Sequence, residues 1–229
     1  MKKILILSLL FVSQITYAQN KINGFGKLQL GMAVKDLPEL SNAKLASDKD
    51  FFNGVYGNIS SSVYEALSDT NKKYQSFGCL DKRVRIFQIG RLQLTDNITL
   101  YDITLNFFND KLYRIEIKDK KLDELLTTKY GTPQEDIKTK DNTFQNGYGA
   151  KFVKTDITKT HKWETGNDNI SCWYTDMYWY NDSGKLNYIG YALLSDKSIT
   201  KLVEIESDIV KARITKREED KKKDLVNGF

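Results

Sequence analysis

The chain has 229 residues, 12% of them aromatic, and a formal net charge of +5 at pH 7. Its 35 basic residues nearly balance its 30 acidic ones, which excludes the strongly basic composition typical of nucleic-acid-binding proteins. The length suits one large domain or two small fused units, and the 13 tyrosines and 11 phenylalanines favour a β-rich fold.

The first 18 residues have the three parts of a secretory signal peptide. Lys2 and Lys3 form the positive region, residues 4–12 form an apolar core, and Ala18 ends a small-residue cleavage site. The core is shorter than the roughly 20 residues that span a membrane, and no cysteine directly follows the site. We therefore expect a periplasmic or secreted protein without a lipid anchor or an integral membrane segment; an uncleaved anchor is the alternative.

The first half of the exported chain, residues 19–120, is predicted to be one α-β-β-β repeat with additional short elements. A short strand is predicted at 28–30, followed by a helix over 33–40 whose apolar residues share one face. Residues 41–82 are rich in Asn, Asp and Gly and predict a long irregular insertion. Within it we expect long loops with one short strand or helix, and residues 63–67 are the candidate strand.

The strand signal strengthens after this insertion. Three alternating segments predict strands over residues 84–94, 98–108 and 111–118. Asn109 and Asp110 form a tight turn between the last two of these strands.

The second half, residues 121–195, is predicted to follow the same plan. A helix over 122–130 ends at Gly131, and the polar residues 134–149 predict turns. Three further strands are then predicted over residues 157–164, 170–180 and 185–194.

A C-terminal amphipathic helix is predicted in residues 196–229. Its apolar positions recur every three or four residues; they are Ile199, Leu202, Ile205, Ile209 and Ala212. Beyond Ile214 the sequence is almost entirely charged, and we expect a solvated helix end or a frayed terminus there.

The strand blocks of the two halves resemble each other in sequence. Residues 98–110 (ITLYDITLNFFND) align with 170–182 (ISCWYTDMYWYND), and 111–117 align with 185–191. Such self-similarity indicates duplicated supersecondary units, although convergence of two amphipathic hairpins is an alternative. We predict an α+β fold of two α-β-β-β repeats with antiparallel sheets, closed by the C-terminal amphipathic helix.

Three short motifs resemble those of exported bacterial proteins with tandem helix-plus-three-strand repeats. They are Leu-Gly-Met-Ala at 30–33, Phe-x-Asn-Asp-Lys-Leu-Tyr-x-Ile at 107–115 and Leu-x-x-Lys-Tyr-Gly-x-Pro at 126–133. The order of elements is similar to the folds of the β-lactamase inhibitor protein and of the outer-membrane assembly lipoprotein BamE. The resemblance implies a fold and no activity, and the missing lipid-bearing cysteine departs from BamE.

Strand alternation divides the side chains of the second block between two faces. Helices are expected to cover the face that carries Trp173, Thr175, Met177 and Trp179. The opposite face carries the candidate binding residues, which are Tyr174, Asp176, Tyr178, Tyr180 and Tyr188. Tyrosine combines a large contact area with a polar end, which suits interfaces. Burial of this face by another part of the chain is the alternative.

These features predict an exported, non-enzymatic module that binds an unidentified protein or peptide of the cell envelope. The second hypothesis is a structural envelope-assembly factor that docks through its C-terminal helix. The third is a hydrolase that uses His161, the single histidine, as a general base. We predict no catalytic residue, metal ion or cofactor, because the sequence has no recognisable catalytic motif or metal-ligand set. Cys79 and Cys172 can form a disulfide in an exported protein, or remain buried thiols.

Overall fold

The computed structural model describes residues 21–46, 63–67, 69, 79–145 and 147–227. The predicted signal peptide and most of the predicted insertion lie outside these residues. The strands are β1 (Gly24–Phe25), β2 (Leu28–Gln29), β3 (Lys44–Ala46), β4 (Val63–Ala66), β5 (Val84–Thr95), β6 (Ile98–Phe108), β7 (Lys111–Ile117), β8 (Gln134–Gln145), β9 (Lys151–Trp163), β10 (Ile170–Tyr180) and β11 (Leu186–Asp196). The helices are the short 3₁₀ turns η1 (Val34–Asp36) and η2 (Pro38–Asn42), and the α-helices α3 (Lys121–Tyr130) and α4 (Lys197–Asn227).

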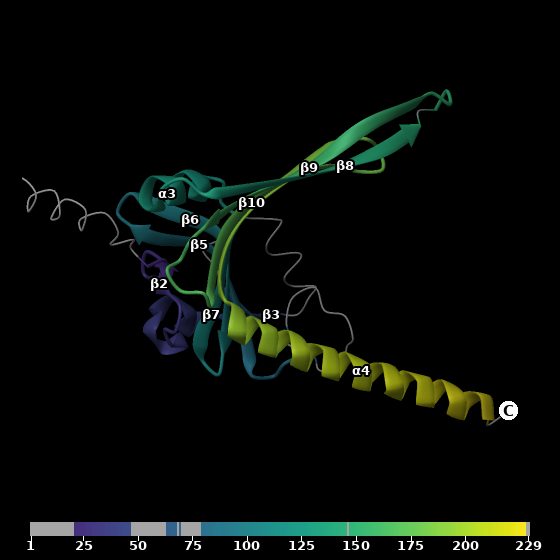
Figure 1. Cartoon of the computed structure of the whole chain (residues 1–229). Helices are drawn as coiled ribbons and strands as arrows, with labels where there is room; N and C mark the ends of the chain where they lie inside the picture. The colour runs from purple at the N-terminus through teal and green to yellow at the C-terminus, as the bar shows by residue number, and fades with distance from the viewer. Residues whose placement is uncertain (1–20, 47–62, 68, 70–78, 146, 228–229) are drawn as a thin grey trace, which may run out of the picture.

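One nine-stranded mixed sheet, in the order β3-β4-β5-β6-β7-β11-β10-β9-β8, dominates the fold (Figure 1). β3 and β4 run parallel, and the remaining neighbours run antiparallel. The prediction of two α-β-β-β repeats with antiparallel sheets is therefore wrong, and the protein is mostly β. β7 pairs directly with β11, with Ile115 opposite Leu194. This pairing satisfies the backbone groups of two strands that would otherwise be edges, and it joins both blocks into one sheet.

Two predicted segments form different structures. The predicted helix over 33–40 is replaced by η1 and η2, separated by an extended Leu37. Pro38 explains this break, because proline disfavours helical backbone in the residue before it. The predicted turns at 134–149 are largely β8, which pairs with β9 along its whole length. Polar pairs across these strands, such as Asn142 Nδ2 to Asp156 Oδ2 at 2.6 Å, replace the apolar alternation that would have indicated a strand.

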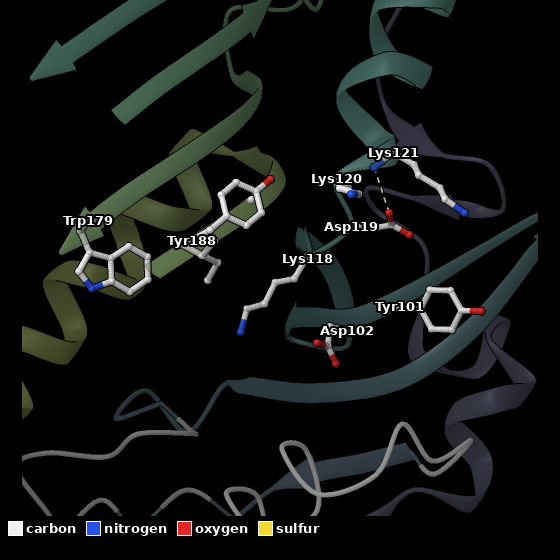
Figure 2. A pocket seen from close by; sticks show the side chains of 10 residues that line it. Tyr101, Asp102, Lys118, Asp119, Lys120, Lys121, Trp179 and Tyr188 are labelled. Carbon is white, nitrogen blue, oxygen red and sulfur yellow. Dashed lines mark hydrogen bonds between the residues drawn. The ribbon is translucent and has the colours of Figure 1, made fainter. Parts of the chain in front are cut away.

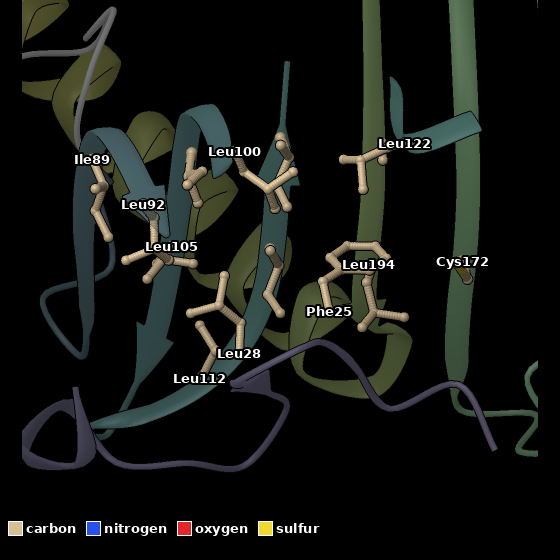
Figure 3. Packing of buried hydrophobic residues seen from close by; sticks show 14 of the residues in the cluster. Phe25, Leu28, Ile89, Leu92, Leu100, Leu105, Leu112, Leu122, Cys172 and Leu194 are labelled. Carbon is tan, nitrogen blue, oxygen red and sulfur yellow. The ribbon is translucent and has the colours of Figure 1, made fainter. Parts of the chain in front are cut away.

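The main core lies on one face of the sheet, under the N-terminal segment and α3 (Figure 3). In the first block it holds the residues that alternation predicts, among them Ile103, Leu105, Phe107, Ile115 and Ile117. In the second block, the core contains the side chains of the sheet face that was predicted to be exposed. These core residues are Cys172, Tyr174, Ala192 and Leu194.

The register between the two blocks explains this difference. Ala192 lies opposite Ile117 on one side and opposite Tyr174 on the other, so all three side chains share the core face. Trp173 and Met177 are consequently on the far face and only partly buried, and Trp179 is exposed. The β7–β11 pairing fixes this register. A sequence alignment of the two blocks does not show how they pair with each other, so it could not predict the register.

Helix α4 packs on the far face of the sheet through a different stripe from the one predicted. Its buried apolar residues are Val203, Val210 and Ile214, which contact Leu80, Val84 and Tyr113. Leu202, Ile205 and Ile209 were expected in this stripe, but each is about half exposed. The residues from Lys216 to Asp224 are exposed, and Figure 1 shows this part of α4 extending beyond the sheet. Within the described ranges, no helix has the length and apolar character needed to cross a membrane.

Cys79 and Cys172 are not bridged in the structure. Cys172 lies in the main core, only 2% exposed, and burial raises the pKa of its thiol to about 12. Cys79 is partly exposed near helix α4, where its Sγ lies 3.8 Å from the Ser207 hydroxyl oxygen. The possible disulfide between these two residues is therefore not formed.

We expect the two thiols to differ in reactivity in the folded protein. At pH 8 the shielded, protonated Cys172 should react with a disulfide reagent such as DTNB only after unfolding, because the thiolate is the reactive form. Cys79 should react at least 10-fold faster in the native state. The Cys79→Ser and Cys172→Ser variants assign each reaction. Rapid labelling of Cys172 in the native protein would contradict the structure. So would the absence of both free thiols when no reductant is present.

Candidate functional site

The predicted binding residues are divided between the core and the surface. Tyr174 is only 2% exposed and belongs to the main core, so the expectation of a solvent-facing ring there is wrong. Tyr178 and Tyr188 are 38% and 44% exposed. They lie opposite each other on β10 and β11, with ring centroids 4.8 Å apart.

Tyr180 lies apart from this pair. Its ring contacts Phe144 of β8 at a centroid distance of 6.5 Å, and the Lys154 ammonium lies 4.5 Å from its centroid. Its backbone N–H donates to Asp156 Oδ1 at 3.0 Å. Tyr180 therefore holds the end of β10 against the β8–β9 ribbon.

Two phenols and one carboxylate form a compact network beneath the exposed rings. Asp176 Oδ1 accepts hydrogen bonds from the hydroxyls of Tyr174 at 2.9 Å and Tyr188 at 2.6 Å. The two phenol oxygens are 3.3 Å apart. We call Tyr174, Asp176 and Tyr188 the phenol–carboxylate network; it anchors the exposed Tyr188 ring to the core through Tyr174.

Gly190 provides the space that this network occupies. A Cβ atom at position 190 would lie 2.3 Å from the Tyr174 hydroxyl, 2.4 Å from the Tyr188 hydroxyl and 2.8 Å from Asp176 Oδ1. Distances this short are repulsive for any pair of heavy atoms that is not hydrogen-bonded. The network can form in this geometry only because residue 190 lacks a side chain.

The phenols of the network remain protonated at neutral pH. Burial, followed by the hydrogen bond to the Asp176 carboxylate, raises the pKa of Tyr188 to about 12. Burial is also the largest cause of the strongly raised pKa of Tyr174. Neither phenol can then act as a phenolate nucleophile or base near pH 7, and the network holds the Tyr188 ring in place through Asp176.

A cleft opens beside this network where the sheet divides. β7 ends at Ile117, whereas β6 on one side and β11 on the other continue past that point. The cleft has a volume of about 570 Å³. Figure 2 shows the residues that line it, among them Tyr101, Asp102, Lys118, Trp179 and Tyr188.

Most of these cleft residues were not predicted from the sequence. Trp179 was assigned to the covered face, but it is 36% exposed and lines the cleft. Asp102 has a left-handed backbone with φ of 49°, and its carbonyl accepts the Lys118 N–H at 3.1 Å. Only Tyr188 belongs to both the predicted site and the cleft.

His161 lies between two carboxylates and outside the cleft. Its Nδ1 is 2.5 Å from Asp123 Oδ1 of α3, and its Nε2 is 3.1 Å from Glu135 Oε2 of β8. Glu135 also forms an ion pair with Lys159 at 2.6 Å, and this contact is the largest cause of its lowered pKa. Because both ring nitrogens face carboxylates, neither is available to a nucleophile. The geometry supports a structural link between α3 and the sheet.

The described ranges contain no group of three or more His, Cys, Asp or Glu side chains arranged to hold a metal ion. Comparisons with known protein families, curated proteins and solved structures found no match to this chain. The resemblance to the β-lactamase inhibitor protein and BamE folds therefore stays a prediction.

Replacing Gly190 with alanine should break the phenol–carboxylate network. The added Cβ forces the Tyr188 hydroxyl away from Asp176, and such overpacking costs about 1–3 kcal/mol of unfolding free energy. Denaturant unfolding measures this loss, and a phenol titration by ultraviolet absorbance should show the pKa of Tyr188 falling below about 12. Gly147→Ala is the matched control, because nothing lies within 4 Å of its Cβ position. Equal stability of the two variants would contradict the geometry.

Proposed function

We propose that this chain is an exported binding module that captures a protein or peptide through the aromatic side chains around the cleft. The proposal depends on one observation: three aromatic side chains are exposed here. We call these residues, Tyr178, Trp179 and Tyr188, the aromatic rim. Trp179 and Tyr188 also line the cleft. Tyrosine and tryptophan are enriched among the residues that dominate binding energy at interfaces.

The mobility of a rim residue affects how well it binds. An exposed side chain that must be immobilised on binding costs roughly 0.5–1.5 kcal/mol. Tyr188 is already held by its hydrogen bond to Asp176 and by its contact with Tyr178. Its ring is therefore pre-organised for a partner, as in rigid aromatic anchors of binding surfaces.

The chemistry of the site favours binding over catalysis. The phenols stay protonated, and His161 is occupied by two carboxylates outside the cleft. The arrangement thus offers apolar area and hydrogen-bonding groups, without an activated nucleophile.

The proposal is tested by removing the aromatic rim. The Tyr178→Ser, Trp179→Ser and Tyr188→Ser triple variant should lose partner capture in a crosslinking pulldown from the native envelope fraction. Affinity for the purified partner should fall by at least about 100-fold, since anchor residues contribute 2 kcal/mol or more each. Tyr174 stays unchanged because it is part of the core.

Tyr148→Ser is the control, since Tyr148 is 98% exposed and lies in the turn between β8 and β9. It should bind as the unmodified protein does. Thermal unfolding of the triple variant establishes that it is folded. Unchanged capture by a folded triple variant would reject the proposed function.

A second candidate function, assembly of an envelope complex, is favoured by one observation on α4. Leu202, Ile205 and Ile209 form an apolar stripe that is about half exposed. They recur at three- and four-residue spacing, as in helices that pack on a partner. In this alternative, α4 carries the contact and the aromatic rim does not.

Substitutions in this stripe separate the two functions. If α4 carries the contact, the Leu202→Ser, Ile205→Ser and Ile209→Ser triple variant should no longer elute with a large envelope complex on size-exclusion chromatography. Deletion of residues 215–229 should weaken the same association. Under this alternative the rim variant stays in the complex. If the unmodified protein elutes from envelope extracts as a small species, the assembly function is excluded.

A further inference from the structure

One edge of β11 is open where it borders the cleft. β11 pairs with β10 along its whole length, from Leu186 to Asp196. On its other side it pairs with β7 only over Ala192–Ser195. In the described part of the chain, no strand pairs with this side of residues 186–191.

The direction of the backbone groups follows from the antiparallel pattern. The Asn181 N–H donates to the Lys185 carbonyl at 3.0 Å, so these two opposed residues share a backbone hydrogen bond next to the turn. Hydrogen-bonding and non-hydrogen-bonding positions alternate along an antiparallel pair. Odd-numbered residues of β11 therefore bond to β10, and even-numbered residues point their N–H and C=O groups the other way.

A hydrogen bond between the neighbouring strands independently gives the same direction for the backbone groups of β11. The Lys118 N–H donates to the Asp102 carbonyl, so even-numbered residues at this end of β7 bond to β6. Odd-numbered residues such as Ile117 then bond to β11, where Ile117 faces the even-numbered Ala192. The N–H and C=O groups of Leu186, Tyr188 and Gly190 consequently face the cleft.

We propose that this open edge of β11 binds an extended peptide as an added strand. The inference rests on the proposed function, and it names both the partner and its mode of binding. Backbone groups in a regular row are matched by another extended backbone, which is the basis of strand addition. A strand opposite residues 186–190 would span about five residues at roughly 3.3 Å each.

The composition of this edge differs from that of the β8 edge of the sheet. β8 is the last strand of the sheet, and its sequence, QEDIKTKDNTFQ, is rich in charged residues. Charged side chains are a common protection against unwanted pairing at an edge. Residues 186–191, with the sequence LNYIGY, carry no charge. The β11 edge thus lacks the protection that β8 has.

The charges around the cleft indicate which peptide fits. Lys120 and Lys121 at the start of α3 are exposed, and Lys118 is partly exposed. The two acidic residues of the lining are Asp102 and Asp119. Asp119 is buried, and its carboxylate accepts the Lys121 backbone N–H at 3.0 Å. The exposed charge is therefore mainly positive, which favours an acidic partner.

The volume and the aromatic rim fit the same ligand. About 570 Å³ lies within the roughly 300–1,000 Å³ of typical ligand sites. Side chains of an added strand alternate between the two faces of the sheet. One set would meet Tyr188 and the other set Trp179 and Ile189, so we expect apolar residues in a segment that also carries acidic ones.

Amide hydrogen exchange tests the open edge in the free protein. The amides of Leu186 and Tyr188 should exchange at least 100-fold faster than those of Asn187 and Ile189, which bond to β10. Equal protection of all four amides would overturn the inference before any ligand is added.

The binding mode is tested with peptides selected from a random library of linear hexapeptides displayed on phage. Each selected peptide is synthesised in two versions, N-methylated at its odd or at its even amide positions. Strand addition requires donors along only one edge of the peptide. One version should therefore lose at least about 30-fold in affinity, while the other stays within about 3-fold of the unmodified peptide.

Variants of residue 186 give the reciprocal test on the protein. Leu186→Pro removes the leucine side chain and also the backbone N–H that faces the cleft, whereas Leu186→Ala removes only the leucine side chain. The proline variant should bind at least 5-fold more weakly than the alanine variant, with thermal unfolding as the check on folding.

The outcomes separate this inference from the proposed function. If peptides bind through the aromatic rim but both N-methylated versions bind alike, strand addition is wrong and the proposed function stands. If selected peptides bind the rim triple variant as well as the unmodified protein, the proposed function fails. If the library yields no binder, strand addition is wrong, and the pulldown with the rim triple variant decides the proposed function.

Discussion

The short pairing between β7 and β11 is the interaction on which the rest of the structure depends. It covers only four residues of β11, from Ala192 to Ser195, yet it joins the two strand blocks into one sheet. It also sets the register that places Tyr174 in the core beside Ala192. Because β7 stops at Ile117, the same pairing leaves the two blocks apart beyond that residue. A continuous core and an open cleft thus have one cause.

Local patterns in the sequence located most of the strands and helix α3, because apolar alternation and turn residues are properties of neighbouring positions. Strands β5, β6, β7 and β10 lie within a residue or two of their predicted ranges. β8 was not predicted because cross-strand polar pairs with the next strand, β9, stabilise it, and the alternation of apolar residues within one strand does not reveal such pairs. The predicted helix over 33–40 failed locally, since Pro38 interrupts it.

The candidate site was only partly accessible to sequence reasoning. Alternation correctly placed Tyr178 and Tyr188 on one face, but it could not tell which half of that face the core would cover. Tyr174 is buried and Tyr188 is exposed on the same face, because the N-terminal segment and α3 extend only part of the way along the strands. The cleft residues Asp102 and Lys118 come from the other block, and only the tertiary pairing brings them near Tyr188.

Gly190 has a consequence for how this protein can change over evolution. No residue other than glycine fits there while both phenols hold the Asp176 carboxylate. In a descendant of this chain, keeping the two tyrosines and the aspartate in this arrangement therefore requires keeping the glycine. A lineage that acquires a side chain at position 190 would have to discard the anchored Tyr188 ring first. The placement of the exposed Tyr188 ring thus depends on a neighbouring residue that has no side chain.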